Sequence, residues 1–291
     1  MGDHEPTIRS RELGEGLRRA MERAGLNGRQ AAHQLDLSPS WISRLLSGKR
    51  NVTAVQVAAF LALCRVTGTE RDRLLALCDD QHVPGWFQQH GSRLPQQLVT
   101  LIDHESKAVA ISQFQEPGVP GLLQTGDYAR ALLSRSGTLP AEEVEDRVAA
   151  RLARQSLLSR DQPARFTFYV HEFALRLPVG GPTVMLDQVE HLLRMSRRPF
   201  LTLRVVPAAL GAHAGMAGAF TLLEFADFRP VVYLENENSS LFLEQPVEIE
   251  SYQHILESLA ETALNEEESR KLIATLATEL YVDREDHDDG A

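Results

Sequence analysis

Three polar side chains lie on one face of a short helix that the sequence predicts near residue 40. Ser43 and Arg44 follow Ser40 by three and four residues, and this spacing places side chains next to one another on a helix. A guanidinium one turn into such a helix donates two hydrogen bonds to the O6 and N7 atoms of a guanine, and a serine hydroxyl bonds to a base or a phosphate. The pattern therefore predicts contacts with DNA, with Arg44 reading a base.

Other polar and basic side chains flank this helix, and we expect most of them to bind phosphates, which fix the register of a protein on DNA. Trp41 leaves two interpretations open: its ring packs on a sugar or a thymine methyl group, or it covers the junction of two helices. The full set of predicted DNA-binding residues is Asn27, Arg29, Pro39, Ser40, Trp41, Ser43, Arg44, Lys49 and Arg50.

Two short helices and a tight turn are needed to position these side chains. Ser38 followed by Pro39 predicts a helix start, because a serine hydroxyl caps the first turn and proline lacks only an amide that is unused there. We expect this helix over 39–46 and a preceding one over 28–35 with Asn27 as its N-cap. A helix that crosses the DNA backbone, followed by one that enters the major groove, is the helix-turn-helix arrangement.

Three further helices are predicted around this pair, over about 12–23, 53–64 and 70–78, which makes a bundle of five. Cys64 and Cys78 are expected to lie on apolar helix faces as small hydrophobic residues, too few for a disulfide framework. The expected core contribution of the last two helices is Val55, Ala58, Ala59, Ala62, Leu74, Leu75 and Leu77.

Residues 27–52 resemble the xenobiotic-response-element family of repressors, which have a phage-repressor fold. The matching positions are Ala32, the turn from Leu35 to Leu37, Ser38, Ile42-Ser43-Arg44 and Gly48. The chain departs from the family at Gly28, where glutamine is usual, and at Leu46, where glutamate is usual. The resemblance implies a five-helix, phage-repressor-like domain at the N-terminus.

Charge is distributed unevenly along the 291 residues. The net charge is −10, yet residues 1–78 carry +4, which leaves −14 on the remainder. A basic segment ahead of an acidic one suits a protein in which only the first segment touches phosphates. No apolar run approaches the roughly 18 residues of a membrane span, and the N-terminus lacks the apolar stretch of a secretory signal. We therefore expect a cytoplasmic protein with no membrane partner.

The rest of the chain is predicted to be a mainly helical α+β domain with a small sheet. We expect a helix-turn-helix domain over 1–80, a linker over 81–95 that carries Trp86 and Phe87, the α+β domain over 96–282 and an acidic tail over 283–291. The expected helices are 96–112, 127–130, 141–160, 183–195, 247–263 and 265–282, and the expected strands are 165–172, 200–206, 219–225 and 231–235.

This second domain resembles a companion domain of unknown function in actinobacterial regulators that are described as antitoxin-like. The matching segments are Pro84-Gly85-Trp86, residues 120–125 and 127–130, Arg154-Gln155, Glu172, residues 180–182, Val206-Pro207, Gly211, residues 218–220 and Tyr233. The resemblance implies a regulator of development or antibiotic production, often paired with a small protein encoded nearby.

Two groups of side chains in this domain are candidates for binding a partner or ligand. Leu122, Leu123 and Gln124 lie in a segment broken by prolines and glycines, which is either a connector with its leucines in the core or a docking loop. Glu172 and Glu235 end predicted strands, and we expect them to line a polar pocket.

Catalytic and metal-binding motifs are not found in the sequence. His171-Glu172, His191, His213 and His104-Glu105 do not have the spacing of a helical zinc motif. The glycine-rich segment 211–220 lacks the strand and helix of a phosphate-binding loop, so a mobile or a sharply turned loop is expected. We predict no enzyme activity, no metal and no cofactor.

The leading hypothesis is a sequence-specific transcriptional regulator that binds double-stranded DNA as a homodimer, since two-fold symmetry matches paired half-sites. Its second domain is expected to dock a small partner protein or to sense a small molecule. The alternative is an antitoxin that sequesters a partner protein and binds DNA for autoregulation. An enzyme is a third, less supported class.

Overall fold

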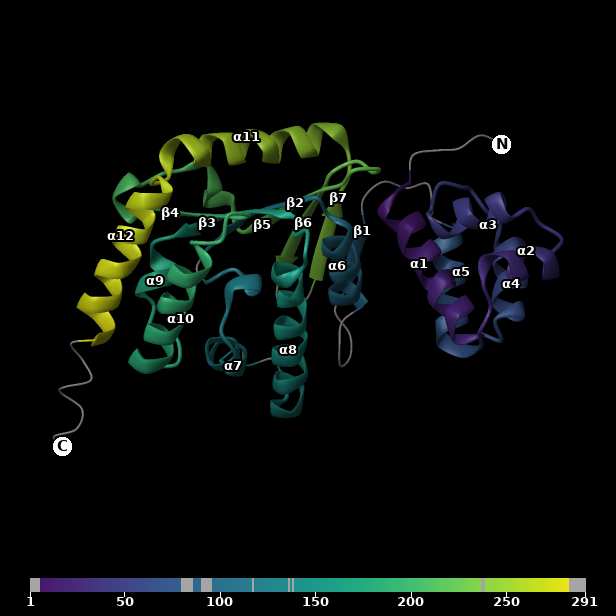
Figure 1. Cartoon of the computed structure of the whole chain (residues 1–291), viewed down its shortest axis with the longest axis horizontal. Coiled ribbons are helices and arrows are strands. Elements are labelled where there is room, and N and C mark those ends of the chain that lie inside the picture. The colour runs from purple at the N-terminus through teal and green to yellow at the C-terminus, as the bar shows by residue number, and fades with distance from the viewer. Residues whose placement is uncertain are drawn as a thin grey trace. The chain divides into compact units, whose positions relative to one another are not determined.

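The computed structural model describes residues 6–79, 86–89, 96–116, 118–135, 137, 139–236 and 239–282. Contacts divide the chain into two units (Figure 1). The first, here called the head, comprises Met1–Gln88 with two short segments, Asp227–Arg229 and Leu241–Glu248. The second, here called the body, comprises the remaining residues. The predicted acidic tail, 283–291, lies outside the described residues.

The head contains five helices in the described part of the chain, as predicted. They are α1 (Ile8–Arg23), α2 (Gly28–Gln34), α3 (Pro39–Leu46), α4 (Ala54–Leu63) and α5 (Gly68–Asp79). Side-chain caps begin the first four: Thr7, Asn27, Ser38 and Thr53 each accept a backbone amide of the first turn. Asn27 also forms a reciprocal capping box with Gln30, so the start of α2 is determined locally.

The core of the head uses a different face of α4 from the one predicted. Val55 is 79% exposed, whereas Val57, Phe60 and Leu61 are fully buried. Both sets have helical spacing, and the set with the larger side chains is buried because it removes more apolar surface from water. The cysteine prediction is confirmed: Cys64 and Cys78 are buried free thiols.

Helices α1 and α3 approach each other closely at Gly14. A methyl group added at Gly14 would lie 2.6 Å from the carbonyl oxygen of Leu46 and 2.9 Å from that of Leu45. Only a residue without a side chain allows two helix backbones to come this near. Gly14 therefore helps to set the position of α3.

The body contains strands β2 to β6 of a mixed β-sheet in which the strand order is β1-β7-β6-β5-β2-β3-β4. The strands are β1 (Trp86–Gln89), β2 (Ala110–Gln115), β3 (Arg165–His171), β4 (Leu201–Val206), β5 (Phe220–Glu224), β6 (Val231–Asn236) and β7 (Ser239–Leu243). Strand β2 runs parallel to β3, with Ala110 opposite Arg165, and β3 runs parallel to β4. On the other side of β2 the pairing becomes antiparallel, because β5 is antiparallel to both β2 and β6.

Helices cover both faces of this sheet. Figure 1 shows α11 along one face and α7, α8 and α10 along the other. The helices of the described body are α6 (Gln96–Lys107), α7 (Gly126–Ser134), α8 (Ala141–Arg154), α9 (Phe173–Arg176), α10 (Pro182–Met195), α11 (Pro246–Thr262) and α12 (Glu266–Ala277). None of the described helices is long and apolar enough to cross a membrane.

The sheet is larger than predicted, because three strands were missed. A single helix was predicted over 96–112. In the structure this helix ends at Lys107, and the strand β2 begins at Ala110 and pairs with a strand on each side. Ile111 and Phe114 are both buried, and their spacing of three residues imitates a helical stripe. Residues 86–89, assigned to the linker, form β1, while the side chains of Trp86 and Phe87 and the rest of that linker lie outside the description.

Candidate functional site

The exposed face of α3 carries the side chains predicted to read DNA. Ser40 and Ser43 are exposed, and Arg44 is half-buried beside them. The Nε atom of Arg44 donates a hydrogen bond to the carbonyl oxygen of Ser40 at 3.4 Å, which lays the guanidinium along the helix. The Oγ atom of Ser38 accepts the amide of Trp41 at 3.1 Å and thereby anchors the first turn.

A groove between α1, α2 and α3 brings several of the predicted phosphate-binding residues together. Asn27, Arg29 and Ser43 line this groove, which has a volume of about 580 Å³, and Pro39 forms part of its wall. Arg18 of α1 also lines it and donates a hydrogen bond from Nη2 to the carbonyl oxygen of Leu46 at 3.2 Å. The sequence analysis missed Arg18, because one arginine among five basic residues in and around α1 is not distinguished by spacing.

The basic residues after α3 pack on aromatic rings within the head. Trp41 is only 8% exposed and belongs to the core of the head, which favours the interpretation that its ring covers the junction of two helices over a contact with DNA. The guanidinium of Arg50 lies 5.2 Å from the centre of the Trp41 ring, and the ammonium of Lys49 lies 5.7 Å from that of Phe228. Both cations are half-buried.

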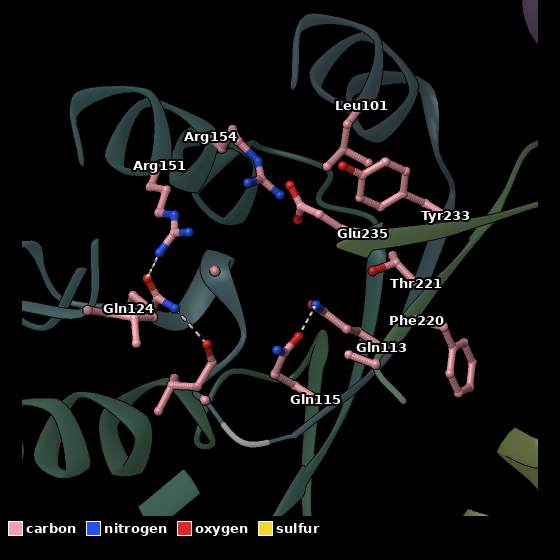
Figure 2. A pocket seen from close by; sticks show the side chains of 15 residues that line it. Leu101, Gln113, Gln115, Gln124, Arg151, Arg154, Phe220, Thr221, Tyr233 and Glu235 are labelled. Atoms are coloured by element: carbon pink, nitrogen blue, oxygen red, sulfur yellow. Dashed lines mark hydrogen bonds between the residues drawn. The ribbon is translucent and has the colours of Figure 1, made fainter. Parts of the chain in front are cut away.

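The body contains a polar pocket of about 250 Å³ (Figure 2). Its walls come from the loop at 118–124, from α8 and from strands β2, β5 and β6, which meet where the sheet changes from parallel to antiparallel pairing. The labelled polar side chains of Figure 2 surround this space: Gln113, Gln115, Gln124, Arg151, Arg154, Thr221, Tyr233 and Glu235.

Two arginines one turn apart on α8 differ in their partners. Arg154 donates from Nη2 and Nε to the two carboxylate oxygens of Glu105 at 2.6 and 2.9 Å. Burial opposes the charge of Arg154, but Glu105 and then Glu235 outweigh it, so the pKa of Arg154 is raised. Arg151 instead donates to the neutral amide oxygen of Gln124 at 2.6 Å.

The charge on Arg151 is poorly compensated within the body. Burial lowers the pKa of Arg151, the negative charge of Glu235 opposes this shift, and the positive charges of Arg154 and Arg147 add to it. Across the pocket, burial raises the pKa of the Tyr233 hydroxyl, and Glu235 raises it further. The pocket is thus lined by two guanidiniums from α8, of which only that of Arg154 is paired with a carboxylate, and by the carboxylate of Glu235 from β6.

Three of the five residues of the body that were predicted to bind a partner or ligand do not line the pocket. Leu122 and Leu123 are 1% and 0% exposed, which favours the connector interpretation over a docking loop. Glu172 does not line the pocket: its carboxylate accepts hydrogen bonds from Arg176 and from the amide of Ala208, and so ties the ends of β3 and β4 together.

Gln124 and Glu235 do line the pocket, but the sequence did not identify the side chains they face. The spacing of Arg147, Arg151 and Arg154 was the available signal, because it places three cations on one face of a helix.

Two histidines of the body, His171 and His213, lie against each other. The rings of His171 and His213 stack with their centres 5.3 Å apart, and the Nδ1 atom of each accepts a backbone amide two residues ahead. Among residues with described positions, no group of three or more histidines, cysteines or acids is arranged to hold a metal ion. The loop from Gly211 to Gly218 turns sharply, with both glycines at positive φ, as predicted.

Two family profiles match the chain. A helix-turn-helix domain matches residues 12–74, and a domain of unknown function (DUF5753) matches residues 98–275. A comparison with curated proteins finds no match.

Proposed function

The chain belongs to the DUF5753 family and carries a helix-turn-helix domain ahead of that region, and we propose that it is a sequence-specific DNA-binding transcriptional regulator whose body senses a small molecule. The DNA-binding part of this proposal rests on α3, which is capped by Ser38 and has one exposed face. Ser40, Ser43 and Arg44 lie on its solvent side, while Ile42 and Leu45 anchor the opposite side in the core. A rigid helix with donors on one face suits the major groove.

Arg44 is the residue we propose to read a base. Arg44→Ala should relax the preference for one base pair and weaken binding to the operator by about 1–3 kcal/mol, the contribution of one bidentate contact. The test is selection of bound sequences from random duplexes, followed by fluorescence anisotropy on the selected site. Arg71→Ala is the matched control, since Arg71 is an exposed arginine that belongs to α5 and not to α2 or α3. Equal affinity and specificity of the Arg44 variant and the parent would exclude α3 as the reader.

Lys49 is proposed to bind a phosphate. Lys49→Ala should weaken binding to all duplexes similarly and reduce the slope of log K against log salt by about 1. Anisotropy titrations at several salt concentrations measure this slope. A loss confined to the selected operator would instead assign Lys49 to base reading.

We further propose that the regulator binds a palindromic operator as a homodimer in the cytoplasm. Two-fold symmetry in the protein matches half-sites about one turn of DNA apart. Light scattering with and without the selected duplex measures the stoichiometry. One chain on one half-site would contradict the dimer.

The sensing role of the body is supported by its polar pocket, which has an incompletely compensated arginine. Partner docking and the antitoxin alternative rest on the resemblance to actinobacterial regulators. Capture of a partner from the native cell, followed by truncation after residue 80, separates these roles. Growth rescue by the body alone would favour sequestration of a toxic partner.

A further inference from the structure

We propose that the pocket of the body binds a small organic acid, with the anionic group on Arg151 and a hydrogen-bond donor of the ligand on Glu235. This inference rests on the proposed sensing role and specifies its ligand. The anionic group is a carboxylate or a phosphate, since a guanidinium binds either one through two parallel hydrogen bonds.

Arg151 is the first reason for this assignment. Among the residues that the structure describes, it forms no ion pair, and its hydrogen bond goes to the neutral Gln124. Arg151 is half-buried, and the carboxylate of Glu235 acts on it without forming an ion pair. A cation partly removed from water is stabilised by a directly paired anion. Gln124 holds one side of the guanidinium, because its own amide donates to the carbonyl oxygen of Val119 at 2.7 Å. The other N–H groups of Arg151 are the donors that an anion would use.

Arg154 differs from Arg151, because its charge is already neutralised. The bidentate pair with Glu105, whose side chain is 3% exposed, holds Arg154 in place. Figure 2 shows Arg154 and Glu235 pointing toward one another at the pocket. With Arg154 balanced by Glu105, Arg151 and Glu235 are the remaining opposite charges that line the pocket. A ligand with an anion at one end and a donor at the other would complement both.

The size and lining of the pocket limit the ligand further. A volume of about 250 Å³ is at the small end for ligand sites and suits one small metabolite. Gln113 and Gln115 hydrogen-bond to each other at 3.1 Å and add amide groups to the floor. Leu132 and Phe220 supply limited apolar surface. A short hydroxy acid or a sugar-phosphate fragment fits this lining, whereas a long acyl chain does not.

The test is binding of four probes to the full chain. 3-Hydroxybutyrate carries an anion and a donor, butyrate only the anion, 3-hydroxybutyramide only the donor, and glycerol 3-phosphate the phosphate version. We expect 3-hydroxybutyrate or glycerol 3-phosphate at about 10 mM to raise the melting temperature through mass action, butyrate to raise it less, and the amide not to raise it. Calorimetry then gives the affinities, and the stronger of the two acids shows which anionic group the site prefers.

Two variants assign the ends of the ligand. Arg151→Gln should weaken binding of both acids by about 10- to 100-fold, because it removes charge-assisted hydrogen bonds. Glu235→Gln should weaken 3-hydroxybutyrate but should not weaken butyrate, because butyrate has no donor for Glu235 and loses a repelling charge. Arg147→Gln is the matched control, since Arg147 lies one turn earlier on α8 and does not line the pocket.

Unliganded melting temperature and operator binding are measured for every variant. They separate misfolding, and failure of the DNA-binding proposal, from failure of the ligand assignment. The assignment is overturned if none of the anionic probes stabilises the parent, or if a folded Arg151→Gln protein responds as the parent does.

Discussion

Replacement of Gly14 by alanine tests how α3 is positioned in the head. The added methyl group would stand 2.6 Å from the carbonyl oxygen of Leu46, whereas carbon and carbonyl oxygen normally approach to about 3.3 Å. The methyl carbon is bonded directly to the backbone of α1 and the oxygen belongs to the backbone of α3, so neither can rotate away. The two helices must therefore separate by about 0.7 Å, the difference between these distances.

The expected cost combines two opposing effects. Overpacking a well-packed core costs up to about 3 kcal/mol, and alanine recovers about 1 kcal/mol of helix propensity relative to glycine. We expect Gly14→Ala to lower the free energy of unfolding of the head by about 2 kcal/mol. For a domain of this size, the melting temperature should fall by about 8–16 °C.

Urea unfolding followed by the fluorescence of Trp41 measures this change, in a Trp86→Phe background because the chain has two tryptophans. Gly28→Ala is the matched control, since its methyl group would meet only the Ile42 side chain, at an ordinary 3.8 Å. That variant should gain about 0.5 kcal/mol by restricting the unfolded chain. The close helix approach would be refuted if both variants shifted the unfolding midpoint upward by similar amounts.

Three further predictions test the caps, the histidines and the buried ion pair. Ser38→Ala should destabilise the head by about 1 kcal/mol, measured by urea unfolding, because the first turn of α3 loses its side-chain acceptor; an unchanged midpoint would show that water replaces the cap. Burial lowers the pKa of both His191 and His213, so the unfolded chain binds more protons, and stability should be retained above about pH 6.5 and lost as the pH falls below it. Thermal melts from pH 7.5 to 5 measure how steeply the melting temperature falls with pH. This fall should be shallower in the double variant His191→Gln, His213→Gln, and an identical fall would assign the acid sensitivity to other groups. Glu105→Gln should cost about 3 kcal/mol, measured by chemical unfolding, because it leaves the Arg154 charge buried without its main partner; a loss near zero would mean that solvent reaches the guanidinium.

The head was largely predictable because its start and stop signals are local. Ser38-Pro39 and Asn27 begin α3 and α2 as predicted, and Gly25 and Gly48 follow α1 and α3 at positive φ. Which face of α4 is buried was not predictable from spacing, because Val55 and Val57 begin two stripes of equal period. Only packing against the other helices selects between them.

The sequence by itself determined where α2 and α3 begin, that three arginines share one face of α8, and that the chain contains a basic segment ahead of an acidic one. Tertiary structure alone decided that β2 is a strand, since its pairing partners lie more than 50 residues away in β3 and more than 100 away in β5. It also decided that Gln124 and Glu235 share a pocket with Arg151, while Glu172 does not. Capping depends on neighbouring residues, whereas a pocket depends on which distant elements the sheet brings together.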